Sequence, residues 1–341
     1  MLKNYDKSKC YIIAEVGGNF CTLDEGKLLV DAALETGVDA IKFQTYKADT
    51  VASRLAVFDM ENTGKVSQYE IFKKYELSDE IHQDIVEYAK NKKIDWFSTP
   101  SHESDVGFLE RMDVPAYKIG SDDAANLPFL RYVAKMNKPI FLSTGMCTMQ
   151  EVSNAVKVIH EEGNNELILL HAITAYPTHP DDVNLLSMLA MQREFAQVPV
   201  GYSDHTIGTT ACICAAAMGA KVIEKHFTYD KNAEGPDHML SADMPEMQKI
   251  VDEIRLFERM RGDGIKQPSK AESTTRVNNR KSIVAVRFIE KGEVITKELL
   301  AVKRPGSGIP PDKLDEISGW FASKDIEADQ VLTLEDIVSE P

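Results

Sequence analysis

Residues 198–226 read VPVGYSDHTIGTTACICAAAMGAKVIEKH, in which two apolar runs flank a segment with helical spacing. The two runs predict strands, and the segment near 207–218 predicts a helix between them. Each predicted strand closes on a histidine, His205 in the first and His226 in the second. Two imidazoles at the same end of neighbouring strands can share one metal ion. This short unit therefore predicts both a local fold and a candidate metal site.

The same alternation of strand and helix repeats along most of the chain. Eight apolar runs, each followed by a helical stretch, predict eight strand-then-helix units. Such a series favours an α/β fold of the (β/α)8 TIM-barrel type over an open doubly wound sheet, which the pattern alone leaves open. The expected strands begin at Tyr11, Asp39, Ile94, Ala116, Pro139, Leu167, Val198 and Lys221. The expected helices lie near 23–36, 79–92, 103–111, 126–136, 148–162, 183–195, 207–218 and 244–260.

Two stretches interrupt this alternation. Residues 45–78 are longer than a usual strand-to-helix loop, which suggests a cover over an active site. Residues 262–279 are typical of a linker, and short strand and turn signals follow them. We therefore expect a barrel domain at 1–261, a linker at 262–279 and a small β-rich domain at 280–341.

The composition narrows the class of protein. The chain has 341 residues and a net charge of -15, and a surface that binds nucleic-acid phosphates needs the opposite, basic excess. None of its apolar runs approaches the roughly 18 residues that a membrane helix needs. The five cysteines form no CxxC pair and are expected to stay reduced. We therefore expect a cytoplasmic protein without nucleic-acid or membrane partners.

The two histidines are the strongest candidates for metal ligands. A single histidine at a strand end is more often a capping or core residue than a ligand. Two histidines at equivalent positions, His205 and His226, reverse that preference. Two neutral imidazoles would leave coordination positions of the metal open for water and substrate oxygens. His238 is either a third ligand or a loop residue.

Lysines and hydroxyls at other strand ends indicate an anionic substrate. Lysines that point into a barrel mouth are costly unless they meet anions, and hydroxyls around them suit a phosphate or carboxylate. Each of these residues taken alone is more often an ordinary strand-end or turn residue. The set comprises Lys42, Lys118, Thr99, Ser121, Ser143 and Ser203.

Acidic residues follow two of the predicted strands. Glu15 closes the first strand and is equally suited to act as a general base or to make a structural hydrogen bond. Asp122 and Asp123 follow the fourth strand, where aspartate can hold a sugar hydroxyl or cap the next helix. We expect a functional role for one of these two aspartates.

In their order along the chain, these clusters resemble those of the sialic acid synthases. That family joins phosphoenolpyruvate to an N-acylated mannosamine-type aldose and forms a nine-carbon 2-keto acid. The resemblance spans nearly the whole chain. Its C-terminal part, with Asn279-Arg-Lys-Ser-Ile-Val-Ala and Lys303-Arg-Pro-Gly-Ser-Gly-Ile, is similar to the family's antifreeze-like (SAF, β-clip) domain. The other matching stretches begin at Ala14 (AEVG), Lys42 (KFQTYKAD), Phe97 (FSTP), Tyr117 (YKIGS), Leu142 (LSTGM), Tyr176 (YPT), Gly201 (GYSDHT), Glu224 (EKHFT) and Gly235 (GPDH).

This resemblance implies roles for individual residues. It implies a manganese or magnesium ion on His205 and His226, with Glu15 beside it as a further catalytic residue. It also implies a domain-swapped homodimer, in which Arg304 of one subunit reaches the amino-sugar in the barrel of its partner. Phosphoenolpyruvate would be held by Lys42, Thr99, Lys118, Ser121, Ser143 and Ser203. The aldose would meet Gln44, Asp123, Tyr176, Asp237 and Arg304.

The departures from the family pattern lie where the aldose would bind. Asn19-Phe20-Cys21 replaces the usual Asn-His, Gly-Ser-Asp-Asp replaces a Gly-Ser-Gly with an acid, and Ala172-Ile-Thr-Ala replaces a Cys-Thr-Ser type of run. The aldose could therefore be acetylmannosamine, the precursor of legionaminate or a sugar that gives a deaminated nonulosonate.

Two other function classes fit parts of the pattern. A class II aldolase or a metal-dependent sugar isomerase could use the same kind of barrel mouth. A binding or ice-adsorbing protein with a degenerate barrel would have no need of both histidines and the lysines together. Release of inorganic phosphate from phosphoenolpyruvate would distinguish the synthase from both.

Overall fold

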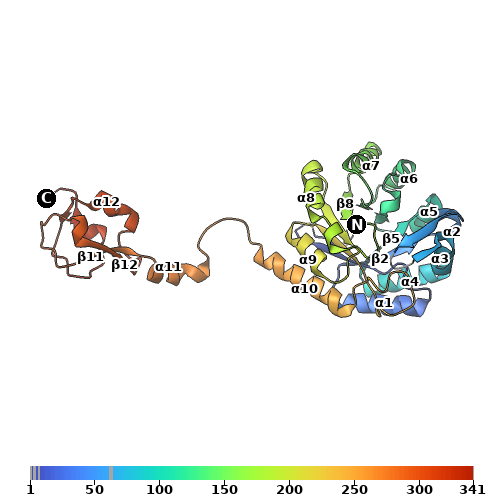
Figure 1. Cartoon of the computed structure of the whole chain (residues 1–341), viewed down its shortest axis with the longest axis horizontal. Helices are drawn as coiled ribbons and strands as arrows, with labels where there is room; N and C mark the ends of the chain where they lie inside the picture. The colour runs from blue at the N-terminus through green and yellow to red at the C-terminus, as the bar shows by residue number, and fades with distance from the viewer. Residues whose placement is uncertain (1, 3–4, 7, 61–63, 341) are drawn as a thin grey trace. The chain divides into compact units, whose positions relative to one another are not determined.

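The chain folds into two compact units, residues 1–261 and 262–341, and each has its own hydrophobic core (Figure 1). The first core lies in and around the barrel, and the second lies within the small C-terminal unit. The computed structural model describes residues 2, 5–6, 8–60 and 64–340.

The first unit contains a closed barrel of eight parallel strands, which confirms the predicted (β/α)8 fold. Each barrel strand pairs with the next one along the chain, and the last pairs with the first to close the ring. Glu15, at the end of the first strand, therefore lies opposite His226 on one side and Lys42 on the other. The barrel strands are β1 (Tyr11–Glu15), β2 (Ala40–Thr45), β5 (Asp95–Pro100), β6 (Tyr117–Ile119), β7 (Ile140–Ser143), β8 (Leu167–Ala172), β9 (Val200–Asp204) and β10 (Val222–His226).

Helices surround the barrel, as Figure 1 shows, and their bounds agree with the predicted ranges within three residues at each end. Thr22 and Thr148 begin the first and fifth of them with capping boxes, which satisfy backbone N–H groups that the first turn leaves without a helical partner. These helices are α1 (Leu23–Glu35), α4 (Asp79–Lys92), α5 (Glu103–Arg111), α6 (Leu127–Ala134), α7 (Met149–Glu161), α8 (Leu185–Glu194), α9 (Thr210–Ala217) and α10 (Met244–Met260). Short 3-10 turns, η1 (Ser121–Asp123) and η2 (Pro180–Asp182), precede α6 and α8.

An aromatic layer fills the lower part of the barrel interior. Phe97 and Phe141 stack with their ring centroids 4.9 Å apart, and Tyr11 stacks on Phe141 at 6.3 Å. All three are buried. Because side chains alternate along a strand, Thr99 and Ser143, two residues further on, point to the same inward face. The aromatic layer thus forms an apolar floor beneath the polar strand ends.

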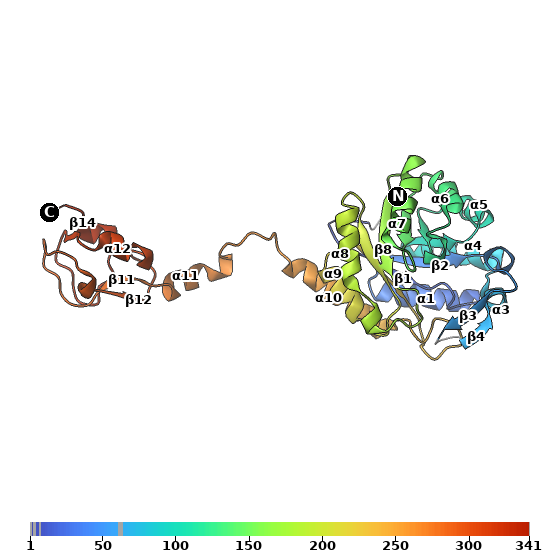
Figure 2. The same cartoon turned by 45° about the horizontal axis from the view of Figure 1, so that its top comes forward.

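The long connection after β2 forms a small substructure of its own, which we name the insert (residues 46–78). It contains α2 (Ala48–Val51), β3 (Val57–Met60), β4 (Gly64–Ser67) and α3 (Gln68–Tyr75). The two strands make an antiparallel pair that is separate from the barrel sheet. Figure 2 shows this pair beside α3.

The C-terminal unit is small and β-rich, as predicted. Its core consists largely of isoleucine and leucine side chains, among them Ile283, Ile295, Leu300, Ile326 and Leu332. The stretch expected as a linker contains η3 (Lys270–Glu272) and α11 (Ser273–Asn279). The remaining elements are β11 (Ser282–Ala285), η4 (Lys297–Leu299), β12 (Leu300–Lys303), η5 (Pro311–Lys313), α12 (Leu314–Ile317), β13 (Phe321–Ala322), η6 (Leu334–Asp336) and β14 (Ile337–Val338). Among the described residues of the whole chain, no helix has the length and apolarity needed to cross a membrane.

Candidate active site

A cavity of about 440 Å³ lies at the carboxyl ends of the barrel strands. The residues that line it from the strand ends and the loops after them are mostly polar, and those that line it from the insert are mostly apolar. The strand ends and the loops that follow them contribute Lys42, Gln44, Thr99, Ser101, Lys118, Ser121, Asp122, Ser143, Thr174, Tyr176, Ser203, His205, Glu224, His226 and Asp237. These residues come together because each lies near the carboxyl end of a parallel strand or in the loop that follows it, and parallel strands of a barrel end at one mouth.

Lys42 is one of two buried cations in this cavity. Its Nζ donates to Thr99 Oγ1 at 2.9 Å and contacts the carboxylate of Glu15 on the neighbouring strand. Glu15 is fully buried and also accepts a hydrogen bond from Gln44 Nε2 at 3.2 Å. Burial lowers the pKa of Lys42 to about 7, although the negative charge of Glu224 acts in the opposite direction. An anionic ligand beside Lys42 would favour its charged form.

Lys118 and Glu224 form the second charged pair. The Lys118 Nζ lies 3.7 Å from Glu224 Oε1, which also accepts a hydrogen bond from Ser203 Oγ at 2.9 Å. Burial alone would raise the pKa of Glu224, but the charges of Lys118 and Lys42 outweigh it and hold the pKa below its ordinary value. Glu224 therefore stays anionic between the two lysines.

Hydroxyl groups beside the lysines are arranged as donors for a ligand. Ser143 Oγ and Thr174 Oγ1 are buried without a hydrogen-bond partner among the described residues, which is uncommon for buried polar atoms. The backbone N–H of Gly145 donates to Ser121 Oγ at 2.9 Å. A Cβ atom on Gly145 would lie 2.3 Å from Thr174 Oγ1, so glycine permits this close approach. Buried donors without partners next to two lysines suit a phosphate or carboxylate.

The two predicted histidines lie side by side at the same mouth. Their ring centroids are 5.4 Å apart, and both rings are buried. His205 Nδ1 lies 2.7 Å from the carbonyl oxygen of Ile173, so it carries the proton and leaves the lone pair on Nε2. Burial lowers the pKa of both histidines, and protonation of His205 would lower the pKa of His226 further. Both imidazoles are therefore neutral, the form that binds metals.

The donor set at the histidines fits a divalent ion. His226 Nδ1 is buried without a hydrogen-bond partner among the described residues and lies 3.6 Å from Asp237 Oδ2. A backbone carbonyl that fixes the tautomer, as Ile173 does for His205, is the usual outer partner of a metal-binding imidazole. The described residues contain no group of three or more His, Cys, Asp or Glu side chains suited to one ion. His205 and His226 are therefore the two imidazoles that could hold such an ion here.

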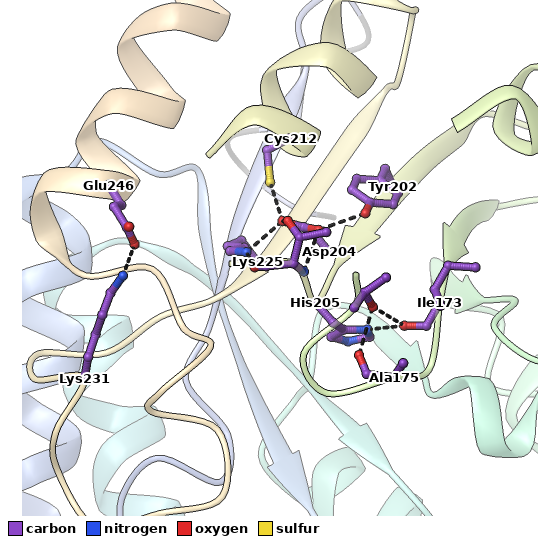
Figure 3. A network of polar contacts seen from close by, with 11 residues as sticks. Ile173, Ala175, Tyr202, Asp204, His205, Cys212, Lys225, Lys231 and Glu246 are labelled. Carbon is purple, nitrogen blue, oxygen red and sulfur yellow. Dashed lines mark hydrogen bonds and ion pairs between the residues drawn. The ribbon is translucent and has the colours of Figure 1, made fainter. Parts of the chain in front are cut away.

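Figure 3 shows a buried network that includes both chain neighbours of His205. Lys225 Nζ donates to Asp204 Oδ2 at 2.7 Å and also contacts the carbonyl oxygen of Thr206. The Asp204 carboxylate accepts further hydrogen bonds from Tyr202 and from the backbone of Thr206. Because Asp204 and Thr206 flank His205 in the chain, this network fixes the segment that carries the imidazole.

Within the barrel unit, two of the predicted site residues, Glu15 and Asp123, do not line the cavity. Glu15 lies beneath the cavity, where its carboxylate contacts Lys42 and Gln44. Asp123 accepts a hydrogen bond from Asn126 at the start of α6 and does not line the cavity. Arg304 belongs to the C-terminal unit and is exposed there. The other predicted site residues line the cavity.

The sequence left some features of the cavity undecided or undetected. It offered both Asp122 and Asp123, of which Asp122 lines the cavity, and it did not single out Thr174, which contributes a buried hydroxyl from the loop after β8. The insert adds an apolar wall, whose α3 residues are spaced as Gln68, Ile71, Phe72 and Tyr75. Residues with this spacing lie on one face of a helix, so this part of the wall could have been predicted from the sequence.

Comparison with known proteins agrees with this geometry. The sequence matches the model of the NeuB family over residues 29–266 and that of the SAF domain over residues 280–338. The N,N'-diacetyllegionaminic acid synthase of Legionella pneumophila is 42% identical over 337 residues, which cover 96% of this chain and 94% of that protein. The human N-acetylneuraminate-9-phosphate synthase is 32% identical over 335 residues, with 96% and 92% covered. A crystal structure of N-acetylneuraminic acid synthetase from Leptospira borgpetersenii in complex with citrate is 29% identical, with a TM-score of 0.69 over 79% of this chain and 90% of that one.

Proposed function

Because this chain belongs to the NeuB family, we propose that it is a nonulosonic (sialic) acid synthase, which joins phosphoenolpyruvate to an N-acetylmannosamine-type aldose. The observation that carries this proposal is the division of one cavity into two halves. One half holds two lysines and hydroxyl donors, and the other holds two neutral imidazoles. The first half suits a small anion and the second suits a metal-activated carbonyl group, so the cavity matches the two substrates of the condensation.

We assign phosphoenolpyruvate to the half that contains the lysines. Its phosphate and carboxylate carry charges that resist burial unless cations and donors meet them. Lys42 and Lys118 supply the cations, and the hydroxyls of Ser143 and Thr174 supply donors that have no hydrogen-bond partner among the described residues. Thr99, Ser121 and Ser203 lie in the same part of the cavity.

The aldehyde of the sugar would then lie between the phosphoenolpyruvate and the histidines. A manganese or magnesium ion on His205 and His226 would supply Lewis-acid polarisation of a carbonyl group. C3 of phosphoenolpyruvate forms a bond to the aldehyde carbon, whose oxygen takes a proton and becomes a hydroxyl. Water adds to the cationic C2 and loses its protons, and the C2–O bond to phosphate breaks to leave a ketone. Tyr176 and Asp237 border the histidines, and we assign them to the sugar.

The decisive experiment measures phosphate release from phosphoenolpyruvate in the presence of a panel of amino-sugar aldoses. We expect release that requires an aldose and stops when EDTA removes divalent ions, with recovery on addition of Mn²⁺ or Mg²⁺. Mass spectrometry should find a nine-carbon 2-keto acid that contains all atoms of the sugar. An aldolase or isomerase would release no phosphate, and that outcome would reject the proposal. Phosphate release that persists unchanged in EDTA would contradict the metal requirement but not the proposed synthase activity.

We further propose that the working unit is a domain-swapped homodimer in which Arg304 acts on the sugar in the partner's barrel. An Arg304→Ala variant and a Lys42→Met variant should each be inactive alone. When the two are refolded together, mixed dimers should regain activity because one of their two sites has both residues intact. A recovery near one quarter of the wild-type rate is expected for random pairing. Size-exclusion chromatography with light scattering gives the dimer content, and failure to recover activity in proven mixed dimers would contradict the swap.

A further inference from the structure

The loop after β8 carries two of the groups that contact His205. Residues 173–178 leave the barrel sheet after β8, and Thr178 then pairs with Thr206, just beyond β9, in an isolated parallel bridge. The carbonyl oxygen of Ile173 lies 2.7 Å from His205 Nδ1, and the ring of Tyr176 packs on that of His205 with the ring centroids 4.2 Å apart. The orientation of the His205 ring therefore depends on the course of this loop.

Thr178 holds this loop to the segment that carries His205. Its side chain is 3% exposed, and its Oγ1 donates to the carbonyl oxygen of Ala175 at 2.8 Å and lies 3.3 Å from that of Ile173. Its backbone N–H donates to the carbonyl oxygen of His205 at 2.9 Å. Figure 3 shows Ile173 and Ala175 beside His205. One residue thus contacts the loop through its side chain and the histidine through its main chain.

The hydroxyl of Thr178 fixes the position of a carbonyl group that the His205 ring needs. Threonine hydroxyls often bond to backbone carbonyls three or four residues earlier and so stabilise a particular turn. A carbonyl oxygen has two lone pairs, so that of Ile173 can accept from His205 Nδ1 while the Thr178 hydroxyl lies beside it. The network around Asp204 holds the chain on either side of the imidazole, and Thr178 holds its acceptor.

We propose that Thr178 is a positioning residue for His205, whose hydroxyl keeps the Ile173 carbonyl oxygen at His205 Nδ1 so that Nε2 stays available for a divalent ion. This inference rests on the proposed metal-dependent function and adds to it a residue that does not line the cavity. Altering the outer partner of a metal-binding imidazole typically weakens metal binding by about 10- to 100-fold. Because Thr178 acts on the ring through a carbonyl group, we expect an effect near the lower end of that range.

The test measures binding of Mn²⁺ alone to the full-length protein, after treatment with EDTA and removal of the chelator. Electron paramagnetic resonance quantifies the free Mn²⁺. Thr178→Val keeps the shape of the side chain and the backbone N–H but removes the hydroxyl, and it should raise the Kd for Mn²⁺ by about 10-fold. Thr178→Ser keeps the hydroxyl and should bind Mn²⁺ like the wild type. Phosphate release by Thr178→Val should need more Mn²⁺ for half-maximal rate and should approach the wild-type rate at saturating Mn²⁺.

Thr36, which directly follows α1, provides the matched control. It is also buried, and its Oγ1 donates to the carbonyl oxygen of Ala33, three residues earlier, at 2.7 Å. Thr36→Val should lower the melting temperature about as much as Thr178→Val and leave the Kd for Mn²⁺ unchanged. Equal Kd values for the wild type and a folded Thr178→Val protein, or an equal rise in Thr36→Val, would overturn the inference. A wild-type protein that bound no Mn²⁺ would instead reject the proposed metal, and with it the role of Thr178.

The tautomer of His205 gives a readout that does not depend on metal. In protein labelled with ¹⁵N-histidine, the ring nitrogen shifts distinguish the Nδ1–H form from the Nε2–H form, and His205→Gln identifies the signals of this residue. We expect the Nδ1–H form in the wild type and in Thr36→Val, and a larger share of the Nε2–H form in Thr178→Val. Weaker Mn²⁺ binding without any change of tautomer would show that Thr178 does not act through the Ile173 carbonyl.

Discussion

Lys42→Met should lower kcat/KM for phosphoenolpyruvate by at least about 1,000-fold, because electrostatic stabilisation in a cavity shielded from water is usually the largest catalytic contribution. Lys42 lies within β2, its side chain is buried and lines the cavity, and we propose that its ammonium is one of two cations that meet phosphoenolpyruvate. Methionine keeps roughly the length and apolar volume of the side chain and removes the charge together with the hydrogen bond to Thr99. Initial-rate measurements of phosphate release, with the protein shown to be folded by circular dichroism, test this result.

A second substitution at Glu15, the ion-pair partner of Lys42, separates the loss of activity from a loss of stability. Without the ammonium, Glu15 becomes a fully buried carboxylate that has lost its cation, so the single variant should also be less stable. The double variant Lys42→Met/Glu15→Gln should regain most of the lost melting temperature and remain inactive. Lys73→Met, which removes an exposed lysine from the outer surface of α3, serves as the control and should retain full activity. Recovery of activity in the double variant would show that Lys42 acts only by neutralising Glu15.

Lys225→Met is expected to lower the free energy of unfolding of the barrel by about 3–5 kcal/mol, the usual result of leaving one member of a buried ion pair alone. Both Lys225 and Asp204 are completely buried, and their charged atoms are 2.7 Å apart. Loss of the lysine leaves the Asp204 carboxylate with neutral donors only. For a domain of this size the melting temperature should fall by about 10 °C. Urea unfolding followed by circular dichroism measures the change.

A nearby surface pair offers the matched control. Lys231 and Glu246 also form an ion pair, visible in Figure 3, but more than a quarter of each side chain is exposed. Lys231→Met should therefore cost less than about 1 kcal/mol. The double variant Lys225→Met/Asp204→Asn, which removes both buried charges, should recover most of the stability. If Lys225→Met and Lys231→Met had equal small effects, the buried network would not be a main source of barrel stability.

The sequence predicted the barrel and the polar part of the site because both can be recognised from the apolar runs of individual strands. Apolar runs identify strands, and a polar residue at the end of such a run must lie at the mouth once the strands are parallel. His205 and His226 satisfy this condition, whereas Lys42 and Lys118 lie within β2 and β6; all four line the cavity. Their prediction required no knowledge of which strands pair.

The remaining features depend on geometry that short patterns do not contain. Asp122 and Asp123 are adjacent in one 3-10 turn, and only the direction of that turn decides that Asp122 faces the cavity. The position of Glu15 beneath the cavity depends on its register opposite Lys42 on the next strand. The buried hydroxyl of Thr174 lies in a loop without a periodic pattern.

The insert also affects how the enzyme can change over evolutionary time. Its strands β3 and β4 pair with each other in a sheet separate from the barrel. A substitution or a change of length in this hairpin therefore leaves intact the strand register that aligns the lysines with the histidines. The wall that the insert adds to the cavity can thus vary in sequence while the pairing of the barrel strands is kept.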